Sequence, residues 1–314
     1  MICDAADGSD GLPGGSIGPM SLDELRDLLA RHARPDLRTA IDDVLIMRAD
    51  EPYPPTPTTY GKVLVLVGQG TKRCGLGDRV YEYGAGQYLV ASAELPVTSH
   101  FAQASPDKPG LGVGLTLDPA AVAEILLLRA TPEAVESTPP PAIAVSTASA
   151  NLLDAVVRLL RLLDQPADVP VLAPLIKREI LWRLITGEQG AIVRQLGLPD
   201  SGLSHVARAV RWIRDNYTER FRVEDVAQQA GMSVSAFYRN FQAVTAMSPI
   251  QFQKQIRLQQ ARLQLAADPS DIAGVSRRVG YDSPSQFSRD YRRQFGTPPS
   301  QDATRLATTG RAGP

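Results

Sequence analysis

Residues 280–299 read GYDSPSQFSRDYRRQFGTPP, and residues 231–249 read GMSVSAFYRNFQAVTAMSP. The two stretches align at an offset of 50 residues, and matching or similar residues fall in step. The matched pairs are Ser233 with Ser283, Ser235 with Ser285, Phe237 with Phe287, Arg239 with Arg289, Phe241 with Tyr291 and Pro249 with Pro299. An internal repeat of this kind indicates one structural unit that is used twice.

A short helical pattern that ends at a glycine precedes each copy. VEDVAQQAG (223–231) and IAGVSRRVG (272–280) place apolar or small residues at i, i+3, i+4 and i+7, which is the spacing of one helix face. The closing glycine supplies a left-handed helix end. Ser233 and Ser283 are the expected N-caps of the next helix, and Pro284 suits its first turn. The pattern predicts two helix-turn-helix units.

The second helix of each unit has an apolar stripe and a polar face. The stripe contains Phe237, Phe241, Val244, Phe287 and Tyr291, which we expect to pack on the preceding helix. The polar faces carry Ser235, Tyr238, Arg239 and Gln242 in the first unit and Ser285, Ser288, Arg289 and Arg292 in the second. Such a face is ordinarily just solvated, but arginine can also contact guanine O6 and N7 with both arms of its fork. The duplication favours the DNA-reading alternative.

The region around the repeat fits this interpretation. Residues 249–267 predict a spacer helix, which would hold two recognition helices about one duplex turn, roughly 34 Å, apart. Residues 204–299 contain 14 Arg and Lys against 8 Asp and Glu, a net charge of +6, whereas the rest of the chain has −7. This asymmetry permits nucleic-acid binding.

Residues 204–306 closely resemble the DNA-binding domain of AraC-type transcriptional regulators, through VEDVAQQAGMSVSAFYRNFQ and VGYDSPSQFSRDYRRQFGTPP. The resemblance implies an all-α domain of seven helices with two helix-turn-helix units. It implies base-reading roles for Ser235, Tyr238, Arg239, Pro284, Ser285, Gln286 and Arg289, to which the polar faces add Gln242 and Arg292. Ser276 departs from the family, which usually has alanine there, and a small polar residue at this position is tolerated if it bonds back to the helix backbone.

The N-terminal part begins with a helical pattern over residues 21–34, where Ser21 and Glu24 predict a capping box. Short strand patterns then follow at 63–67, 79–83 and 87–91, separated by glycines, and predict an antiparallel barrel or sandwich. From Pro119 the pattern becomes helical. Helices are expected at 121–130, 149–164 and 173–187, with a Pro-rich break at 138–142.

The segment from about 22 to 185 resembles the N-terminal regulatory domain of one subgroup of AraC-type regulators, through GDRVYEYGAG and ASPDKPGLGVGLTLDP. The resemblance implies a cupin-like barrel that binds a small effector, with helices that dimerise. The predicted fold class is therefore α+β and multidomain, with an N-terminal cupin-like antiparallel β-barrel, flanking helices and a C-terminal all-α double helix-turn-helix domain. We expect a disordered head (1–19), a barrel domain with linker helices (20–190), a linker (191–203), the DNA-binding domain (204–306) and a disordered tail (307–314).

Candidate effector residues in the barrel are Tyr81, Tyr83, Tyr88 and His100. Metal-dependent cupins need a histidine cluster, and His100 is the one histidine of the barrel region, so we expect neither a metal site nor a cofactor nor an enzyme. Cys74 lies beside Lys72 and Arg73, whose charge would favour a reactive thiolate. Sensing through Cys74 is therefore an alternative, although the barrel offers no second cysteine.

These patterns predict a cytoplasmic DNA-binding transcriptional regulator. The expected partners are a double-stranded DNA operator, RNA polymerase, an unidentified small-molecule effector and a second copy of the chain. No run approaches the roughly 18 apolar residues of a membrane span, and the two cysteines form no disulfide framework. Two alternatives stay open, namely a catalytic cupin with a helical DNA-binding tail and a regulator whose barrel dimerises without sensing.

Overall fold

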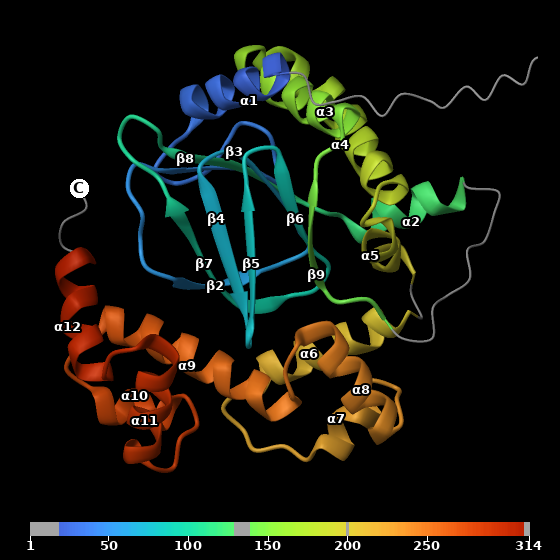
Figure 1. Ribbon diagram of the computed structural model, residues 1–314. Coiled ribbons are helices and arrows are strands. Elements are labelled where there is room, and N and C mark those ends of the chain that lie inside the picture. The colour runs from blue at the N-terminus through green and yellow to red at the C-terminus, as the bar shows by residue number, and fades with distance from the viewer. Residues whose placement is uncertain (1–18, 129–138, 199–200, 311–314) are drawn as a thin grey trace, which may run out of the picture.

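The computed structural model describes residues 19–128, 139–198 and 201–310 (Figure 1). The predicted head lies outside the described residues up to position 18, and so does the predicted tail from position 311. Helix α12 (Pro299–Gly310) extends into the first four residues of the expected tail.

Two antiparallel sheets face each other and form the centre of the N-terminal part (Figure 1). One has the order β1-β8-β3-β6-β9 and the other β2-β7-β4-β5. The strands are β1 (Val44–Ala49), β2 (Thr56–Tyr60), β3 (Val63–Gln69), β4 (Thr71–Leu76), β5 (Arg79–Gly84), β6 (Gln87–Ala91), β7 (Leu95–Gln103), β8 (Gly110–Thr116) and β9 (Ile143–Thr147). The predicted antiparallel β architecture is confirmed, including the three strand patterns read from the sequence.

Strand β3 shows how the two faces of the five-stranded sheet are used. Its side chains alternate, so Leu64 and Leu66 lie in the core under the helices while Val65 and Val67 lie between the sheets. A continuous apolar run, rather than an alternating one, is expected for a strand that is buried on both faces.

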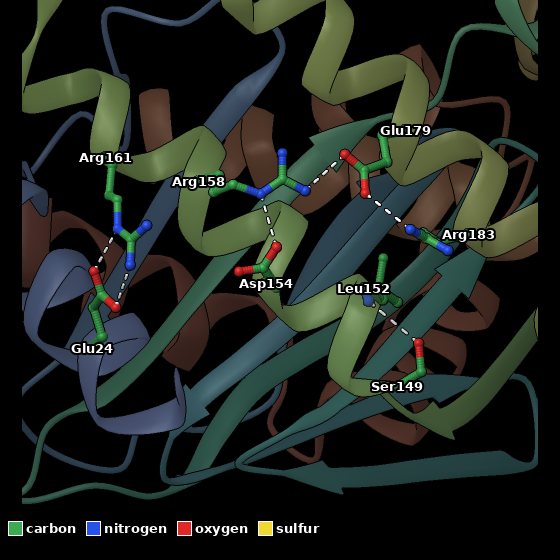
Figure 2. Close-up of polar contacts among 8 residues, drawn as sticks. All are labelled: Glu24, Ser149, Leu152, Asp154, Arg158, Arg161, Glu179 and Arg183. Atoms are coloured by element: carbon green, nitrogen blue, oxygen red, sulfur yellow. Dashed lines mark hydrogen bonds and ion pairs between the residues drawn. The ribbon is translucent and has the colours of Figure 1, made fainter. Parts of the chain in front are cut away.

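Helices cover the outer face of that sheet (Figure 1). They are α1 (Pro19–His32), α2 (Pro119–Leu127), α3 (Ala150–Arg161), α4 (Val169–Thr186) and α5 (Gly190–Arg194), with short 3₁₀ turns at Leu162–Asp164, Pro166–Asp168 and Gln195–Gly197. Ser149 caps α3 by accepting a hydrogen bond from Leu152 N at 3.3 Å (Figure 2). The predicted capping box of α1 is wrong, because the helix begins at Pro19 and Ser21 lies inside it.

Ion pairs join α1, α3 and α4 above the sheet (Figure 2). Arg161 on α3 donates two hydrogen bonds to the Glu24 carboxylate of α1, at 2.6 and 2.7 Å. Arg158 donates to Asp154 on its own helix at 2.8 Å and to Glu179 on α4 at 2.7 Å. These charged hydrogen bonds join three helices whose buried apolar residues belong to one core with the outer face of the five-stranded sheet.

The stretch 191–203, expected as a linker, contains α5 and a 3₁₀ turn. Ile192 and Val193 are buried in the core between the helices and the sheet. Ser201 then caps α6, accepting from Ser204 N at 3.1 Å. The chain therefore passes between the two parts through folded structure, with residues 199–200 outside the described ranges.

The described C-terminal residues form seven helices, as the family resemblance implied. They are α6 (Gly202–Asp215), α7 (Val223–Gln229), α8 (Val234–Thr245), α9 (Pro249–Ala267), α10 (Ile272–Arg278), α11 (Pro284–Phe295) and α12. Both predicted N-caps are confirmed, with Ser233 accepting from Ala236 N and Ser283 from Gln286 N. The predicted apolar stripe, which comprises Phe237, Phe241, Val244, Phe287 and Tyr291, is buried.

The turn glycines of the two units differ in their surroundings. Both have positive φ, +72° at Gly231 and +86° at Gly280, but a Cβ at Gly231 would lie 3.4 Å from its nearest neighbour, whereas one at Gly280 would lie 2.3 Å from Thr218 O. We expect Gly231→Ala to lower the free energy of unfolding by about 1 kcal/mol, from backbone strain alone. Gly280→Ala should cost about 2 kcal/mol more, because the loop carbonyl must also move.

Urea denaturation of the two glycine variants checks this difference, since each serves as the other's control. Equal losses would mean that the α6–α7 loop yields freely to a methyl group at Gly280.

Ser276 does not form the bond back to the helix backbone that would make a polar residue tolerable there. The side chain is 0% exposed, and no described residue, the α10 backbone included, forms a hydrogen bond with its hydroxyl. Removing a buried hydroxyl that lacks a partner relieves its desolvation cost, so Ser276→Ala should raise the free energy of unfolding by about 1 kcal/mol. Urea denaturation measures this effect, with the exposed Ser300→Ala as the control for helix propensity. A loss of stability in Ser276→Ala would show that the hydroxyl finds a partner in solution.

Candidate nucleic-acid interface and effector site

The first helix-turn-helix unit presents its polar face to solvent on α8. Ser235, Tyr238, Arg239 and Gln242 are all exposed, and they lie opposite the buried Phe237. Among the described residues, none forms a hydrogen bond or ion pair with the Arg239 guanidinium. Five N–H donors are therefore available on this face for base edges or phosphates.

The second unit repeats this arrangement on α11. The predicted residues Pro284, Ser285, Gln286, Arg289 and Arg292 are exposed. Within the described ranges, Arg289 and Arg292 also have no hydrogen-bond or ion-pair partner. The helix begins with a capped turn and carries both arginines on its solvent face, which is the composition that suits a groove of DNA.

Helix α9 fixes the two units relative to each other. Arg257 donates to Tyr217 O at 2.6 Å and Thr218 O at 3.0 Å in the loop before α7, and to Gly280 O at 2.7 Å in the turn of the second unit. Gln253 donates to the same loop, at 3.0 Å to Tyr217 O. One arginine thus ties the first unit to the turn of the second, which restricts the spacing of α8 and α11.

The barrel contacts the first unit and α9 directly (Figure 1). Ala142 N donates to Val244 O at 3.1 Å, and the Gln259 side chain donates to Val97 O of β7 at 3.2 Å. At this junction lies a cavity of about 560 Å³, which is lined by Pro55, Gly75, Gly77, Asp78, Thr98, Ala246, Met247, Gln251, Lys254, Gln255, Leu258, Asp290, Arg293 and Gln294. A change in the barrel can therefore reach the helix that holds the two units.

The four predicted effector residues are not brought together. Tyr81 and Tyr83 on β5 face the space between the sheets, where they pair across the ladder with Cys74 and Lys72. Tyr88 lies in the core on the opposite face of the five-stranded sheet, under the helices.

His100 also lies apart from the two interior tyrosines. Its neighbours on β7, Ser99 and Phe101, are the buried ones, and its ring lies edge-on to Tyr53 with a centroid distance of 6.4 Å. Strand alternation therefore turns Tyr88 and His100 away from the space that Tyr81 and Tyr83 face.

Cys74 is also placed differently from its prediction. The residue is 0% exposed, and burial raises the pKa of its thiol to about 12, although the positive charge of Lys72 acts in the opposite direction. The thiol is therefore protonated near neutral pH, and its burial does not favour the alternative of a thiolate sensor.

The sequence interpretation missed the polar side chains that do share the barrel interior. Lys72 was considered only as a neighbour of Cys74, yet β4 alternation turns both residues inward. Tyr60 on β2 and Ser99 on β7 face the same space, with 2.8 Å between the Tyr60 Oη and the Ser99 Oγ. The sequence did contain a signal for this placement. Lys72, Cys74 and Leu76 occupy alternate positions, so a strand that turns Cys74 and Leu76 inward also turns Lys72 inward.

Two further features are absent from the described part of the chain. No group of three or more His, Cys, Asp or Glu side chains there could hold a metal ion. None of the helices in those ranges has both the length and the apolar composition of a membrane span.

Comparison with known proteins gives two domain matches. Residues 40–192 match the family model for the AraC-type transcriptional regulator N-terminus, and residues 226–305 match a helix-turn-helix domain. Similar relatives include the virulence regulon transcriptional activator VirF of Yersinia enterocolitica, 29% identical over 175 residues that cover 55% of this chain and 64% of VirF. The regulator ExsA of Pseudomonas aeruginosa is 28% identical over 157 residues, covering 50% of this chain and 56% of ExsA.

Solved structures of similar fold include wild-type ToxT from Vibrio cholerae with a bound unsaturated fatty acid. The TM-score is 0.52 at 10% identity, over 83% of this chain and 93% of ToxT. This likeness concerns the fold, and it spans both the barrel and the helical part.

The two family matches occupy the barrel with its helices and the double helix-turn-helix, in the order that the geometry shows. The chain belongs to the AraC-type transcriptional regulators, with an AraC-type N-terminal domain followed by a helix-turn-helix domain.

Proposed function

We propose that the protein binds a double-stranded DNA operator sequence-specifically and regulates transcription in response to a small molecule. The observation that carries this proposal is the pair of capped helices, α8 and α11, which expose Arg239 and Arg289 at matching positions. Two exposed helices that each carry an arginine suit major-groove recognition, because arginine can contact guanine with both arms of its fork. Such a regulator works where the DNA is, in the cytoplasm, and we assign it no catalytic role.

The base-reading residues follow from the exposed faces. We assign Ser235, Tyr238, Arg239 and Gln242 in the first unit, and Pro284, Ser285, Gln286 and Arg289 in the second, to the major groove. Arg292 lies one turn further along α11, where a phosphate contact is expected. Arg293 instead pairs with Asp290 at 2.6 Å.

A small molecule acts on DNA binding through the barrel. The contacts of the barrel with Val244 and with Gln259 of α9 support this proposal, since they let the barrel bias how the two units are held. ToxT, a protein of similar fold, has been solved with a bound unsaturated fatty acid, which supports a small ligand in this architecture. RNA polymerase is the further partner that we propose, which in vitro transcription on a bound promoter would test.

The experiment for this function is genome-wide mapping of bound sites, with and without candidate metabolites. A defined set of sites that share one motif, and whose occupancy changes with a metabolite, is the expected result. Binding spread evenly over the genome would contradict sequence-specific regulation. Sites that ignore every metabolite would instead favour a barrel that only dimerises.

We propose that the protein is a homodimer that uses α4. Val171, Leu175 and Trp182 fall on one face of this helix and are 67%, 62% and 40% exposed. An apolar helix stripe left in water favours association with a second copy of the same stripe. Leu175→Glu should convert the dimer to a monomer in sedimentation experiments, whereas Val80→Glu, on an exposed strand position, should leave it unchanged. A wild-type monomer at micromolar concentration would contradict this proposal.

A further inference from the structure

A lysine is buried inside the barrel without an acceptor for its ammonium group. Lys72 is 3% exposed, and its Nζ lies 4.6 Å from the ring centroid of Phe101. In the part of the chain that the structure describes, no side chain or carbonyl accepts a hydrogen bond from Nζ, and no carboxylate pairs with it. An ammonium has three donors, and buried charges in proteins are ordinarily paired and hydrogen-bonded. The ring supplies only a weak cation–π contact.

A second buried polar group lies on the neighbouring strand. Lys72 is the cross-strand partner of Tyr83, whose buried hydroxyl lies beside that of Tyr60 but has no close hydrogen-bond partner within the described ranges. Directly opposed residues of two strands have side chains within reach of one ligand. The nearby hydroxyls of Tyr60 and Ser99 bond to each other, so they are already satisfied. The Lys72 ammonium has no acceptor, and the Tyr83 hydroxyl beside it can donate to a ligand, so the two groups mark a place for one.

On the strand opposite this pair, glycine occupies three alternate positions, which all face the same side. Leu111, Val113 and Leu115 of β8 point into the core under the helices, so Gly110, Gly112 and Gly114 face the space between the sheets. A Cβ at Gly110 would lie 2.5 Å from the Phe101 ring, so glycine lets that ring lie against the strand. The other interior neighbours are apolar, among them Val65 and Val67.

We propose that the barrel interior binds a small monocarboxylate, which accepts hydrogen bonds from the Lys72 ammonium and the Tyr83 hydroxyl. This inference rests on the proposed response of the barrel to a small molecule and names the class of that molecule. One ammonium and one hydroxyl match the two oxygens of a carboxylate, whereas a phosphate would call for more donors. The apolar interior suits a short hydrocarbon tail.

The protonation of Lys72 gives a pH test. Burial lowers the pKa of Lys72 to about 8. Burial raises the pKa of Cys74 to about 12 and also raises the pKa values of Tyr60 and Tyr83, whereas it lowers the pKa of His100. Between pH 7 and 9, Lys72 is therefore the group of this cluster that loses its charge. Carboxylate affinity should be constant below pH 7 and fall about tenfold per unit above 8.

The experiment uses the full-length protein and straight-chain monocarboxylates of two to eight carbons, each compared with its primary amide by isothermal titration calorimetry. At least one carboxylate should bind, and its amide should bind at least about tenfold more weakly. Lys72→Met should reduce the affinity by at least about tenfold, and Tyr83→Phe by a smaller factor. Lys254→Met, in the junction cavity, and the exposed Lys108→Met serve as controls and should leave it unchanged. Circular dichroism verifies that each variant is folded.

Several results would overturn the inference. One is that no carboxylate of the panel binds the wild-type protein. Others are that Lys72→Met and Tyr83→Phe bind as tightly as wild type, or that the loss occurs in Lys254→Met instead, which would place the site at the junction. The same preparations are tested for selection of genomic DNA fragments. If the wild-type protein selects specific DNA fragments but binds no carboxylate, only the ligand class is refuted. If the wild-type protein selects no fragments, the proposed function itself is refuted.

Discussion

Replacing Asp302 with alanine is expected to lower the stability of the second helix-turn-helix unit by about 3 to 5 kcal/mol. Asp302 on α12 is 0% exposed and accepts hydrogen bonds from Arg262 of α9 and Tyr291 of α11, both at 2.8 Å, and from Arg305 at 2.6 Å. One carboxylate therefore joins three helices. Its removal leaves the Arg262 guanidinium, which is 13% exposed, without its partner in the core.

Native-state hydrogen exchange measures this loss locally. The amides of α11 and α12 should open about 100-fold or more as often in Asp302→Ala, while those of α3 should keep their wild-type protection. Glu82→Gln is the control, because the Arg73–Glu82 pair is about half exposed on both sides, and it should change stability by at most about 1 kcal/mol. Unchanged protection of α11 in Asp302→Ala would mean that the apolar contacts alone hold the unit together.

The same carboxylate predicts a pH dependence. Burial by itself raises the pKa of Asp302, but hydrogen bonds from Arg305, Arg262 and Tyr291 outweigh burial and hold the pKa below 3.8. A folded pKa below the unfolded value means that the stabilisation is complete above the unfolded pKa. It is lost as the pH falls from about 4 through the folded pKa. The acid sensitivity of α11 protection should therefore be smaller in Asp302→Ala.

The double variant Arg239→Ala/Arg289→Ala is expected to lower operator affinity by about 2 to 6 kcal/mol, which is at least about 30-fold. Each arginine is exposed on its own recognition helix, and a bidentate arginine–guanine contact contributes about 1 to 3 kcal/mol. The two positions lie in different helix-turn-helix units, so their effects should add. Fluorescence anisotropy with an operator and a scrambled duplex measures both affinity and discrimination.

The control for this variant is Arg34→Ala, an exposed arginine just after α1, which should bind the operator as wild type does. Binding should weaken as salt rises, because neutralised phosphates release counterions. An equal loss on operator and scrambled DNA would make the two arginines phosphate contacts and would contradict their base-reading roles.

The helical half could be predicted closely from the sequence because its signals are local. A glycine turn, a serine cap and an apolar stripe act within a few residues, and their repetition at an offset of 50 made the pattern specific. The packing of Ser276 could not be predicted, because it depends on neighbours from other helices, and none of the described residues pairs with its hydroxyl.

The barrel was harder to predict in detail. Its antiparallel strands followed from glycine turns and alternation, but the face on which each tyrosine lies depends on the register of pairing across distant strands. Tyr83 and Tyr88 are five residues apart in sequence and lie on opposite sides of the five-stranded sheet. Lys72 escaped attention because its burial becomes visible only when β5 and β7 are placed beside it.

Footprinting on a DNA fragment recovered from the genome tests the central claim, sequence-specific reading by two helix-turn-helix units, most directly. Two protected major-groove segments, about one helical turn apart on one face of the duplex, are the predicted result, and both should disappear in Arg239→Ala/Arg289→Ala. A footprint confined to one segment would contradict reading by two units. Protection that covers every fragment alike would contradict sequence-specific binding itself.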